Sequence, residues 1–280
     1  MIDLHTHSTY SDGTLTPGQL VAEAKKQGLE AIALTDHNTV LGLEAFMEEG
    51  RRQGVETIPG AELTAQWEDK ELHILGLLIP QTQYGKITAR LDLFCQRKEE
   101  SNYRLVEALT RAGMALDYPA LREKEKGYVN RAVIGRAMTE AGYTQSVAEA
   151  FEKYLQPGQG FYTPPQRENA LEVLRFLKSI GAVTVLAHPF LNLEEESLKR
   201  FLADAIPAGL DAMEVLYSDY DSQTTAISLE LAEHYSLLCS GGSDFHGSNK
   251  PAIALGTGRG TLEIPYAYLT QLKKKAKSER

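Results

Sequence analysis

Six of the seven histidines in this 280-residue chain lie in short polar motifs at the ends of hydrophobic runs. The motifs are His5-Thr6-His7, Thr35-Asp36-His37, Glu71-Leu72-His73, Ala187-His188-Pro189 and Ser243-Asp244-Phe245-His246. The acidic residues Asp12, Glu62 and Asp244 lie in equivalent positions. Because histidines scattered by chance would seldom recur in this way, the pattern predicts a shared set of metal ligands delivered by successive strands.

Each motif alone has an ordinary explanation. His5 and His7 are two apart on a predicted strand, so both side chains point to one face, but His-x-His by itself is a weak metal signal. Asp12 could form an Asx-turn, and Asp36-His37 could cap the following helix. Recurrence favours the metal site, because the carboxyl ends of parallel strands meet at one edge, where ligands gather.

Two histidines need separate treatment. His73 lies near the start of its predicted strand, so its position fits a ligand and a buried, hydrogen-bonded histidine equally well. His234 lies at the end of a predicted helix, where histidine commonly complements the helix dipole, and we exclude it from the ligand set.

The ligand types narrow the choice of metal. Imidazoles and carboxylates without thiolates suit Zn, Mn or Fe(II) and disfavour copper and iron–sulfur sites. Nine candidates exceed the four ligands of one tetrahedral ion. We therefore expect two or three divalent ions bridged by a carboxylate and water. Such clusters generate hydroxide near neutral pH and hold the oxygens of a phosphoryl group.

Strands and helices alternate along most of the chain. The predicted strands are Ile2–His5, Ala31–His37, Val55–Glu62, Leu72–Ile79, Val183–His188, Asp211–Tyr217 and Leu237–Ser240. The predicted helices are Thr16–Gln27, Gly42–Gln53, Glu168–Ile180, Leu193–Ala205 and Ser222–Tyr235. This alternation predicts a parallel sheet, either open or closed into a barrel.

Residues 84–162 interrupt the alternation. They show helical periodicity over Leu91–Gly113, Arg131–Gly142 and Val147–Leu155 and contain no convincing strand. We expect an inserted helical subdomain that covers the active site, with the barrel formed by residues 1–83 and 163–280. The glycine-rich segment Gly256–Gly260 is interpreted as a turn.

Composition is that of an ordinary soluble globular protein, with 42% hydrophobic and 24% charged residues. We expect no membrane segment, no secretory signal and no obligate protein partner, and two cysteines suit the reducing cytoplasm. The net charge of −9 disfavours an extended nucleic-acid groove, although bound divalent ions would attract a small anion. The run Lys273–Lys277 is interpreted as a solvated helix end.

Taken in order, the motifs resemble those of the PHP family, named for polymerase and histidinol phosphatase. They are His5-x-His7, Tyr10-Ser11-Asp12-Gly13, Thr35-Asp36-His37-Asn38, Gly60-x-Glu62, His73, Ala187-His188-Pro189 and Ser243-Asp244-x-His246. The resemblance spans the chain outside the insert, and an ordered series of this kind is highly specific. It implies a distorted (β/α)7 TIM-like barrel with a trinuclear metal site.

The resemblance also implies how the ligands divide. His5, His7, Glu62 and Asp244 hold one ion. Glu62, His73 and His188 hold a second, with Glu62 bridging, and Asp12, His37 and His246 hold the third. On this basis His73 is a ligand, and Asp36 orients neighbouring ligands.

The helical insert resembles that of one branch of the family. That branch removes phosphates from nucleotides, including nucleoside 3′,5′-bisphosphates, and some members trim short RNA from the 5′ end. The resemblance implies that Arg131, otherwise an ordinary surface arginine, binds the substrate phosphate with its planar fork. Arg136 is a weaker candidate. Relatives often carry histidine where this chain has Val133, which affects recognition of the second phosphate or the leaving group.

We therefore expect a metal-dependent phosphoesterase acting on small nucleotides or short 5′-phosphorylated RNA through a metal-bridging hydroxide. Catalytic roles fall to Glu62 and His188, and either His188 or a metal-bound water protonates the leaving oxygen. One alternative is a histidinol-phosphate phosphatase, with the same barrel and metals. Another is a non-catalytic PHP module, which predicts eroded ligands. A nucleic-acid-binding module without catalysis fits the charge poorly.

Overall fold

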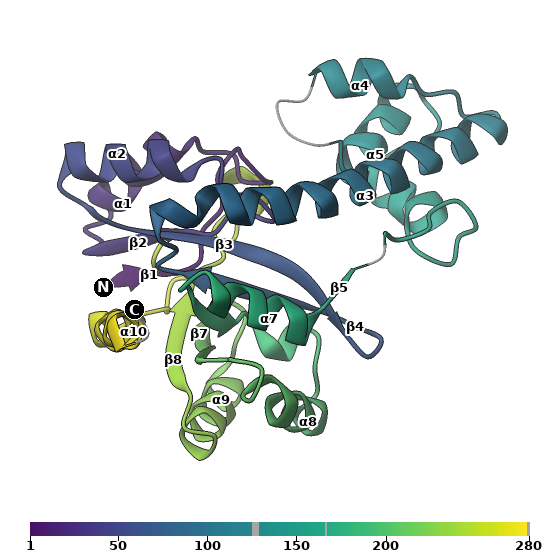
Figure 1. Ribbon diagram of the computed structural model, residues 1–280. Helices are drawn as coiled ribbons and strands as arrows, with labels where there is room; N and C mark the ends of the chain where they lie inside the picture. Colours follow the sequence, from purple (N-terminus) through teal and green to yellow (C-terminus); the bar gives the residue numbers. More distant parts are fainter. Residues whose placement is uncertain (125–128, 166, 279–280) are drawn as a thin grey trace. The chain divides into compact units, whose positions relative to one another are not determined.

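The computed structural model describes residues 1–124, 129–165 and 167–278 (Figure 1). Two compact units are present, one of Met1–Ala89 with Arg167–Arg280 and one of Arg90–Gln166. The first unit contains a sheet in the order β1-β2-β3-β4-β6-β7-β8. These strands are β1 (Ile2–Asp3), β2 (Ala31–Leu34), β3 (Glu56–Trp67), β4 (Lys70–Leu77), β6 (Val183–Leu186), β7 (Ala212–Tyr217) and β8 (Leu238–Gly242). The short β5 (Glu168–Asn169) pairs with β3.

The two ends of this sheet meet through backbone hydrogen bonds beyond β1 and β8. The amide of Leu4 donates to the carbonyl of Gly241 over 3.2 Å, and the amide of Asp244 donates to His5 over 2.9 Å. The amide of His7 donates to Phe245 over 2.9 Å. These bonds nearly close the sheet, and the expected distorted TIM-like barrel of seven strands is confirmed.

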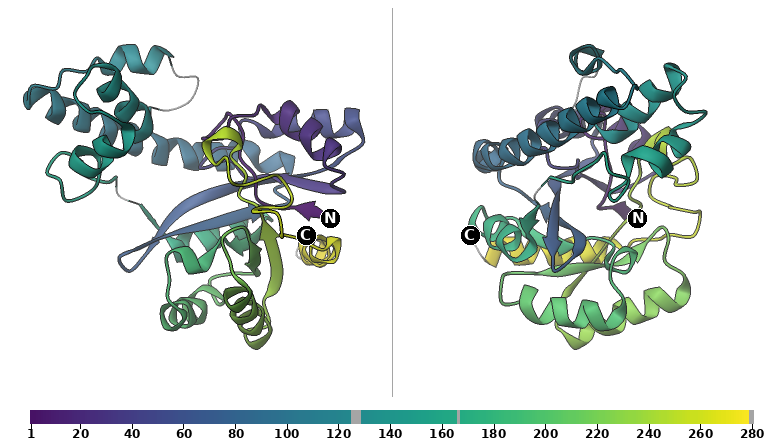
Figure 2. Two further views of the ribbon diagram at one scale, coloured as in Figure 1. Left: turned by 180° about the vertical axis from the view of Figure 1, so that it is seen from behind. Right: turned by 90° about the vertical axis from the view of Figure 1, so that its right-hand side faces the viewer.

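Helices cover the outside of the barrel. They are α1 (Pro17–Lys26), α2 (Leu43–Gln53), α7 (Ala170–Ser179), α8 (Glu195–Ala205), α9 (Ser222–His234) and α10 (Tyr266–Ser278). Helices α1 and α2 lie on one side of the sheet and α7, α8 and α9 on the other (Figures 1 and 2). Leu269 and Leu272 of α10 belong to the buried core that the strands share. No helix in the described residues is both long and apolar enough to cross a membrane.

Local sequence explains where these helices begin and end. Thr16 caps α1 by accepting a hydrogen bond from the amide of Gln19, whose side chain accepts one from the amide of Thr16. Gly54 ends α2 with a φ of 71°, a left-handed conformation that glycine adopts without steric strain. The five helices predicted for the barrel agree with those observed to within two residues at each end, whereas the helix predicted over Leu91–Gly113 begins earlier, at Tyr84.

The expectation of a wholly parallel sheet is wrong at β4. This strand runs antiparallel to both β3 and β6. Only Glu68 and Asp69 separate β3 from β4, and so short a connection permits a hairpin but no crossover. As a consequence, His73 near the start of β4 pairs with Thr64, just beyond Glu62 on β3. The start of β4 therefore lies at the end of the barrel where the parallel strands of the sheet end.

The second unit is helical in its described residues. Helix α3 (Tyr84–Arg111) begins in the first unit and continues into the second, followed by α4 (Tyr118–Lys124), α5 (Arg131–Glu140) and α6 (Val147–Ala150). A short π-helix, Phe151–Leu155, follows α6 directly. Leu109, Ile134, Met138 and Leu155 belong to a buried cluster of this unit alone, separate from the barrel core.

We expect Gly242→Ala to strain the junction of β8 with β1. A Cβ at this position would lie 2.1 Å from Cβ of His5 and 2.7 Å from its amide nitrogen, far closer than van der Waals contact. Overpacking of this kind costs about 1–3 kcal/mol or more, and here it also pushes against His5. Chemical denaturation measures the loss in free energy of unfolding.

Gly85→Ala is the matched control, because no atom lies within 4 Å of its added Cβ. It should leave the midpoint unchanged or raise it slightly. Equal stability of the two variants would contradict the close packing of β8 on β1.

Candidate metal centre

The nine predicted ligands all lie in the barrel unit, on or just after its strands. His5 and His7 follow β1, Asp12 lies in the loop beyond, and His37 follows β2. Glu62 lies within β3 and His73 within β4, paired strands of the hairpin. His188 follows β6, and Asp244 and His246 follow β8. The structure brings all nine together, His73 included.

Four overlapping groups have ligand atoms within 4.8 Å of one another. They are His7 with Asp12, His37 and His246; His5 with His7 and Asp244; His5 with Glu62 and His188; and His37 with Glu62 and His73. Because neighbouring groups share members, the arrangement is one continuous cluster of several potential ion positions.

The Glu62 carboxylate lies at the centre of this cluster. Its Oε2 lies 3.2 Å from Nε2 of His5, 3.2 Å from Nε2 of His7 and 3.0 Å from Nδ1 of His37. Its Oε1 lies 2.8 Å from Nδ1 of His73 and 3.1 Å from Nε2 of His188. Glu62 is fully buried, and the two oxygens face different sets of imidazoles, as a bridging ligand would require.

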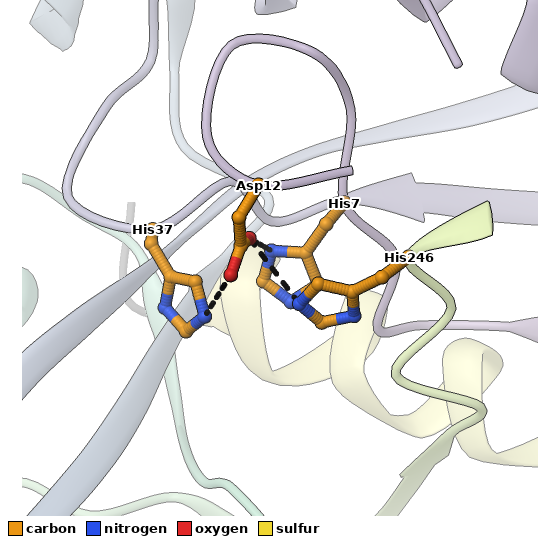
Figure 3. A group of neighbouring side chains, drawn as sticks. All are labelled: His7, Asp12, His37 and His246. Atoms are coloured by element: carbon orange, nitrogen blue, oxygen red, sulfur yellow. Dashed lines mark ion pairs between the residues drawn. The ribbon is translucent and has the colours of Figure 1, made fainter. Parts of the chain in front are cut away.

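Two further carboxylates extend the cluster. Asp12 Oδ1 lies 3.2 Å from Nε2 of His246 and 3.8 Å from Nδ1 of His7, and its Oδ2 lies 3.9 Å from Nε2 of His37. Figure 3 shows the Asp12 carboxylate between these rings. Asp244 Oδ1 lies 3.1 Å from Nε2 of His7. Both carboxylates face imidazole nitrogens, as metal ligands would.

Unsatisfied buried atoms test whether this cluster fits metal ions. Asp12 Oδ1, Glu62 Oε2 and His73 Nδ1 are buried and have no hydrogen-bond partner. Buried polar atoms without a partner are rare in proteins because each loses its hydration. All three atoms face other candidate ligands, and imidazole and carboxylate donors suit divalent Zn, Mn or Fe. The residues therefore fit bound divalent ions.

Mutual ion pairing shifts the pKa values of these groups. Burial alone would lower the pKa of His7, but the Asp244 and Glu62 carboxylates raise it to about 9. Burial would also lower the pKa of His73, but the Glu62 carboxylate outweighs this effect and raises the pKa to about 10. The pKa of His5 is also raised well above its usual range by carboxylates, whereas burial lowers that of His37.

The pKa values of the carboxylates are lowered. Burial would raise the pKa of Glu62, but the surrounding histidines hold it well below its usual range. Burial would likewise raise the pKa of Asp244, but His5 and His7 lower it well below its usual range. The pKa of Asp12 is lowered chiefly through His246 and His37 against the effect of burial. Without metal, the lowered carboxylate pKa values and the raised pKa values of His5, His7 and His73 therefore favour ion pairs between these groups.

Asp36 fixes the loop that joins His7 to Asp12. Its Oδ1 accepts hydrogen bonds from the amide of Ser8 at 2.7 Å and from the hydroxyl of Ser11 at 2.6 Å. Its Oδ2 accepts from the Ser8 hydroxyl at 2.6 Å. These contacts are of the kind that orient metal ligands from outside the metal's own coordination shell.

Sequence reasoning missed Glu214, a fully buried carboxylate on β7. Its Oε1 lies 3.0 Å from Nδ1 of His5, and its Oε2 accepts a hydrogen bond from the amide of His188 over 2.7 Å. Because its carboxylate engages Nδ1 of His5, Nε2 of that ring is left to face the cluster. A glutamate inside the apolar run Ala212–Tyr217 is the signal that could have found it.

Three of the six non-glycine residues with a positive φ in the described structure lie at the cluster. Asn38, His188 and Asp244 have φ values of 51°, 28° and 56°, a left-handed region that residues other than glycine seldom adopt. All three are predicted ligands or direct neighbours of one. Strained residues of this kind persist where the surrounding contacts enforce them, and they concentrate at functional sites.

Arg131 of the insert makes contacts within its own unit. Nη1 of Arg131 donates to the carbonyl of Leu155 over 3.0 Å, and its guanidinium lies 4.4 Å from the centre of the Tyr162 ring. Val133 is buried in the core of the insert, and Arg136 is exposed. A role for either arginine toward a substrate stays a prediction.

Comparison with known proteins identifies similar chains. A model of the PHP domain matches residues 3–168. The 5′-3′ exoribonuclease Rnm of Escherichia coli strain K12 is 36% identical, over 87% of this chain and 84% of its own length. A phosphoribosyl 1,2-cyclic phosphate 1,2-diphosphodiesterase of Eggerthella lenta is 31% identical, over 88% and 94%. A 3′,5′-nucleoside bisphosphate phosphatase of Chromobacterium violaceum is 28% identical, over 88% and 87%.

A solved structure extends the similarity to nearly the whole chain. It comes from Bifidobacterium adolescentis, and its assignment as a metal-dependent phosphoesterase is provisional. The TM-score is 0.82 at 28% identity, covering 98% of this chain and 96% of the other. The similarity therefore includes the barrel and the inserted segment together.

We expect Glu62→Gln to remove most of the bound metal. The substitution keeps the shape of the side chain but removes the charge that faces five imidazoles. Elemental analysis after reconstitution and desalting measures the equivalents retained. Asp69→Asn, the same chemical change at a side chain 82% exposed on the β3–β4 turn, is the control. Equal metal content in both variants would contradict a bridging role for Glu62.

The stability of the metal-free protein should fall as the pH rises above about 6.5. The folded-state pKa values of His7 and His73, about 9 and about 10, lie above their value of 6.5 when unfolded. Protonated imidazoles therefore contribute stability that is complete below pH 6.5 and lost through pH 9–10. Thermal melts from pH 6 to 10 measure this loss.

With metal bound, the melting temperature should instead rise with pH over the lower part of this range. Metal ions bind neutral imidazoles, so they bind more tightly as the imidazoles lose their protons. Melts with and without Mn²⁺ give the comparison. A metal-free protein that became more stable from pH 6.5 to 9 would contradict the paired cluster.

Proposed function

The chain belongs to the PHP domain family, and we propose that it hydrolyses phosphate esters of small nucleotides or short 5′-phosphorylated oligonucleotides. It is a metal-dependent phosphoesterase, a hydrolase acting on phosphate ester bonds. The observation that carries the nucleotide proposal is a complete, buried cluster of nine ligands in a chain whose relatives include an exoribonuclease and a nucleoside bisphosphate phosphatase. A non-catalytic module would have no use for so complete a set.

The ligand groups suggest how two or three ions would be held. His5, His7, Glu62 and Asp244 form a first set, Glu62, His73 and His188 a second, and Asp12, His37 and His246 a third. The grouping of His5 and His7 with Asp244 supports the first set, and that of Asp12 with His37 and His246 supports the third. For the second set the support is Glu62 Oε1, which lies 2.8 Å from Nδ1 of His73 and 3.1 Å from Nε2 of His188. Bound Mn, Zn or Fe would supply an activated water and neutralise charge on the phosphate.

The remaining chemistry falls to the protein's own side chains. Glu62 belongs to two of the ligand sets, and its two oxygens face different imidazoles. His188 is held by Glu214 through its amide and by Glu62 through Nε2, and either its ring or an activated water would supply the proton to the leaving oxygen. The deep burial of His5, His7 and Glu62 excludes bulk water from one side of the cluster.

Arg131 is our candidate for binding a substrate phosphate from the insert. Its guanidinium has five N–H donors, of which the Leu155 carbonyl accepts one, and the Tyr162 ring supports its flat face. Residue 133 is a valine buried in the insert core, so this chain offers no imidazole at that position. Recognition of a second phosphate would therefore depend on other groups.

The test is phosphate release by the protein reconstituted with Mn²⁺. Adenosine 3′,5′-bisphosphate, a 5′-phosphorylated dinucleotide and histidinol phosphate are compared at equal concentration. We expect the nucleotides to be hydrolysed with a kcat/KM at least about tenfold above that of histidinol phosphate, and Arg131→Ala to raise KM by about tenfold. Arg104→Ala, an arginine of the same unit that is 70% exposed, is the control.

Preference for histidinol phosphate would reject the nucleotide assignment. An unchanged KM in Arg131→Ala would remove that arginine from the site while leaving the metal chemistry in place.

A further inference from the structure

Side-chain exposure divides the ligand cluster into a buried side and an open side. His5, His7 and Glu62 are fully buried, whereas Asp12 is 44% exposed and His37 is 23% exposed. A substrate must reach the cluster from solvent. The edge that carries Asp12 and His37 is therefore the side from which a phosphate ester enters.

Lys250 brings a positive charge to the cluster from within the barrel unit. Its Nζ lies 2.6 Å from Oδ2 of Asp244, and the hydroxyl of Tyr217 donates to the same oxygen over 2.9 Å. The other oxygen, Oδ1, faces Nε2 of His7. Asp244 thus separates two functions, with Oδ1 available to an ion and Oδ2 held by Tyr217 and Lys250.

Exposure distinguishes the two donors to Oδ2. Tyr217 is 4% exposed, and Lys250 is 42% exposed, close to the value for Asp12. An ammonium has three N–H donors, of which Asp244 accepts one. Lys250 therefore has two further N–H donors for other partners while it remains in contact with a candidate ligand.

The turn before Lys250 is fastened to the open edge. The side-chain amide of Asn249 donates to the carbonyl of Asp12 over 2.7 Å, and the amide of Ser248 donates to Thr14 Oγ1 over 3.0 Å. The amide of Lys250 donates back to the carbonyl of Gly247, which turns the chain with a φ of 65°. These bonds fix the base of the lysine beside the loop that carries Asp12.

We propose that Lys250 forms a phosphate subsite on the barrel, in which its ammonium binds a non-bridging oxygen of the substrate's phosphate at the open edge of the metal centre. The proposal rests on the phosphoesterase function and adds a recognition group to it. Among the ion pairs of the described residues, the contact of Lys250 with Asp244 is the one in which a lysine or arginine meets a predicted ligand.

This subsite would add a protein donor for the phosphate that is held at the cluster itself. A phosphate dianion at the cluster needs hydrogen-bond donors as well as ions, and an ammonium is a strong point-charge donor to phosphate. Because Lys250 belongs to the barrel, it is present at the cluster whatever position the insert adopts.

The test uses the full-length protein loaded with Mn²⁺ and measures three quantities for each variant. These are the metal content, the dissociation constant for inorganic phosphate by calorimetry, and KM and kcat for adenosine 3′,5′-bisphosphate. Lys250→Met should weaken phosphate binding and raise KM by about tenfold with metal content unchanged, since it removes a charged hydrogen bond. Lys250→Arg should recover part of the affinity.

Lys199→Met is the matched control, because this lysine of α8 is 36% exposed and pairs with Glu195 and Glu196, which lie outside the cluster. It should bind phosphate like the wild type.

Two outcomes would overturn the proposal. Loss of metal from Lys250→Met with an unchanged phosphate affinity of the loaded fraction would mean that Lys250 only positions Asp244. Unchanged affinity with full metal content would mean that it has no role in binding. If the wild type fails to hydrolyse the nucleotide yet Lys250→Met still weakens phosphate binding, the subsite stands and the nucleotide assignment falls.

Discussion

The buried carboxylate of Glu62 is the constraint on which the rest of the structure depends. An isolated charge at a fully buried position is strongly unfavourable, and it persists only opposite charges or ions of the other sign. Five imidazoles face it, one from β4 and the others from the loops after β1, β2 and β6. Two of those loops are fixed by hydrogen bonds, the one after β1 through Asp36 and the one after β6 through Glu214. The polar end of the barrel is organised around one side chain.

The β3–β4 hairpin shows how the fold serves this constraint. A wholly parallel barrel would place the beginning of β4 at the far end from Glu62. Reversal of β4 through Glu68 and Asp69 places His73 near Glu62 within the same hairpin. His73, Leu75 and Leu77 are every second residue of β4 and therefore lie on the same face of the strand. The two leucines belong to the barrel core. One strand thus supplies both packing and a ligand, because its side chains repeat every two residues.

The sequence was informative where chemistry and secondary structure follow local rules. His5, His37 and His188 could be assigned because each follows an apolar run, and the helices because capping residues mark their ends. The direction of β4 could not be derived from its own residues, since it depends on a two-residue turn whose significance appears only in the paired structure. Glu214 was missed for a different reason. It lies in the middle of a strand, and its partners His5 and His188 are distant in the sequence, so only the closed barrel reveals its role.

Closure of the barrel has a consequence for how the protein is made. Asp3 of β1 accepts hydrogen bonds from Ser243, 240 positions away, and the ligands His5 and His7 meet Asp244 at the same junction. Contacts of such wide separation form late in folding because a long loop must first be closed. During synthesis, the first two histidines emerge long before Asp244 and His246 exist. The complete cluster therefore cannot assemble until His246 has left the ribosome, which ties the capture of metal to the closure of the barrel.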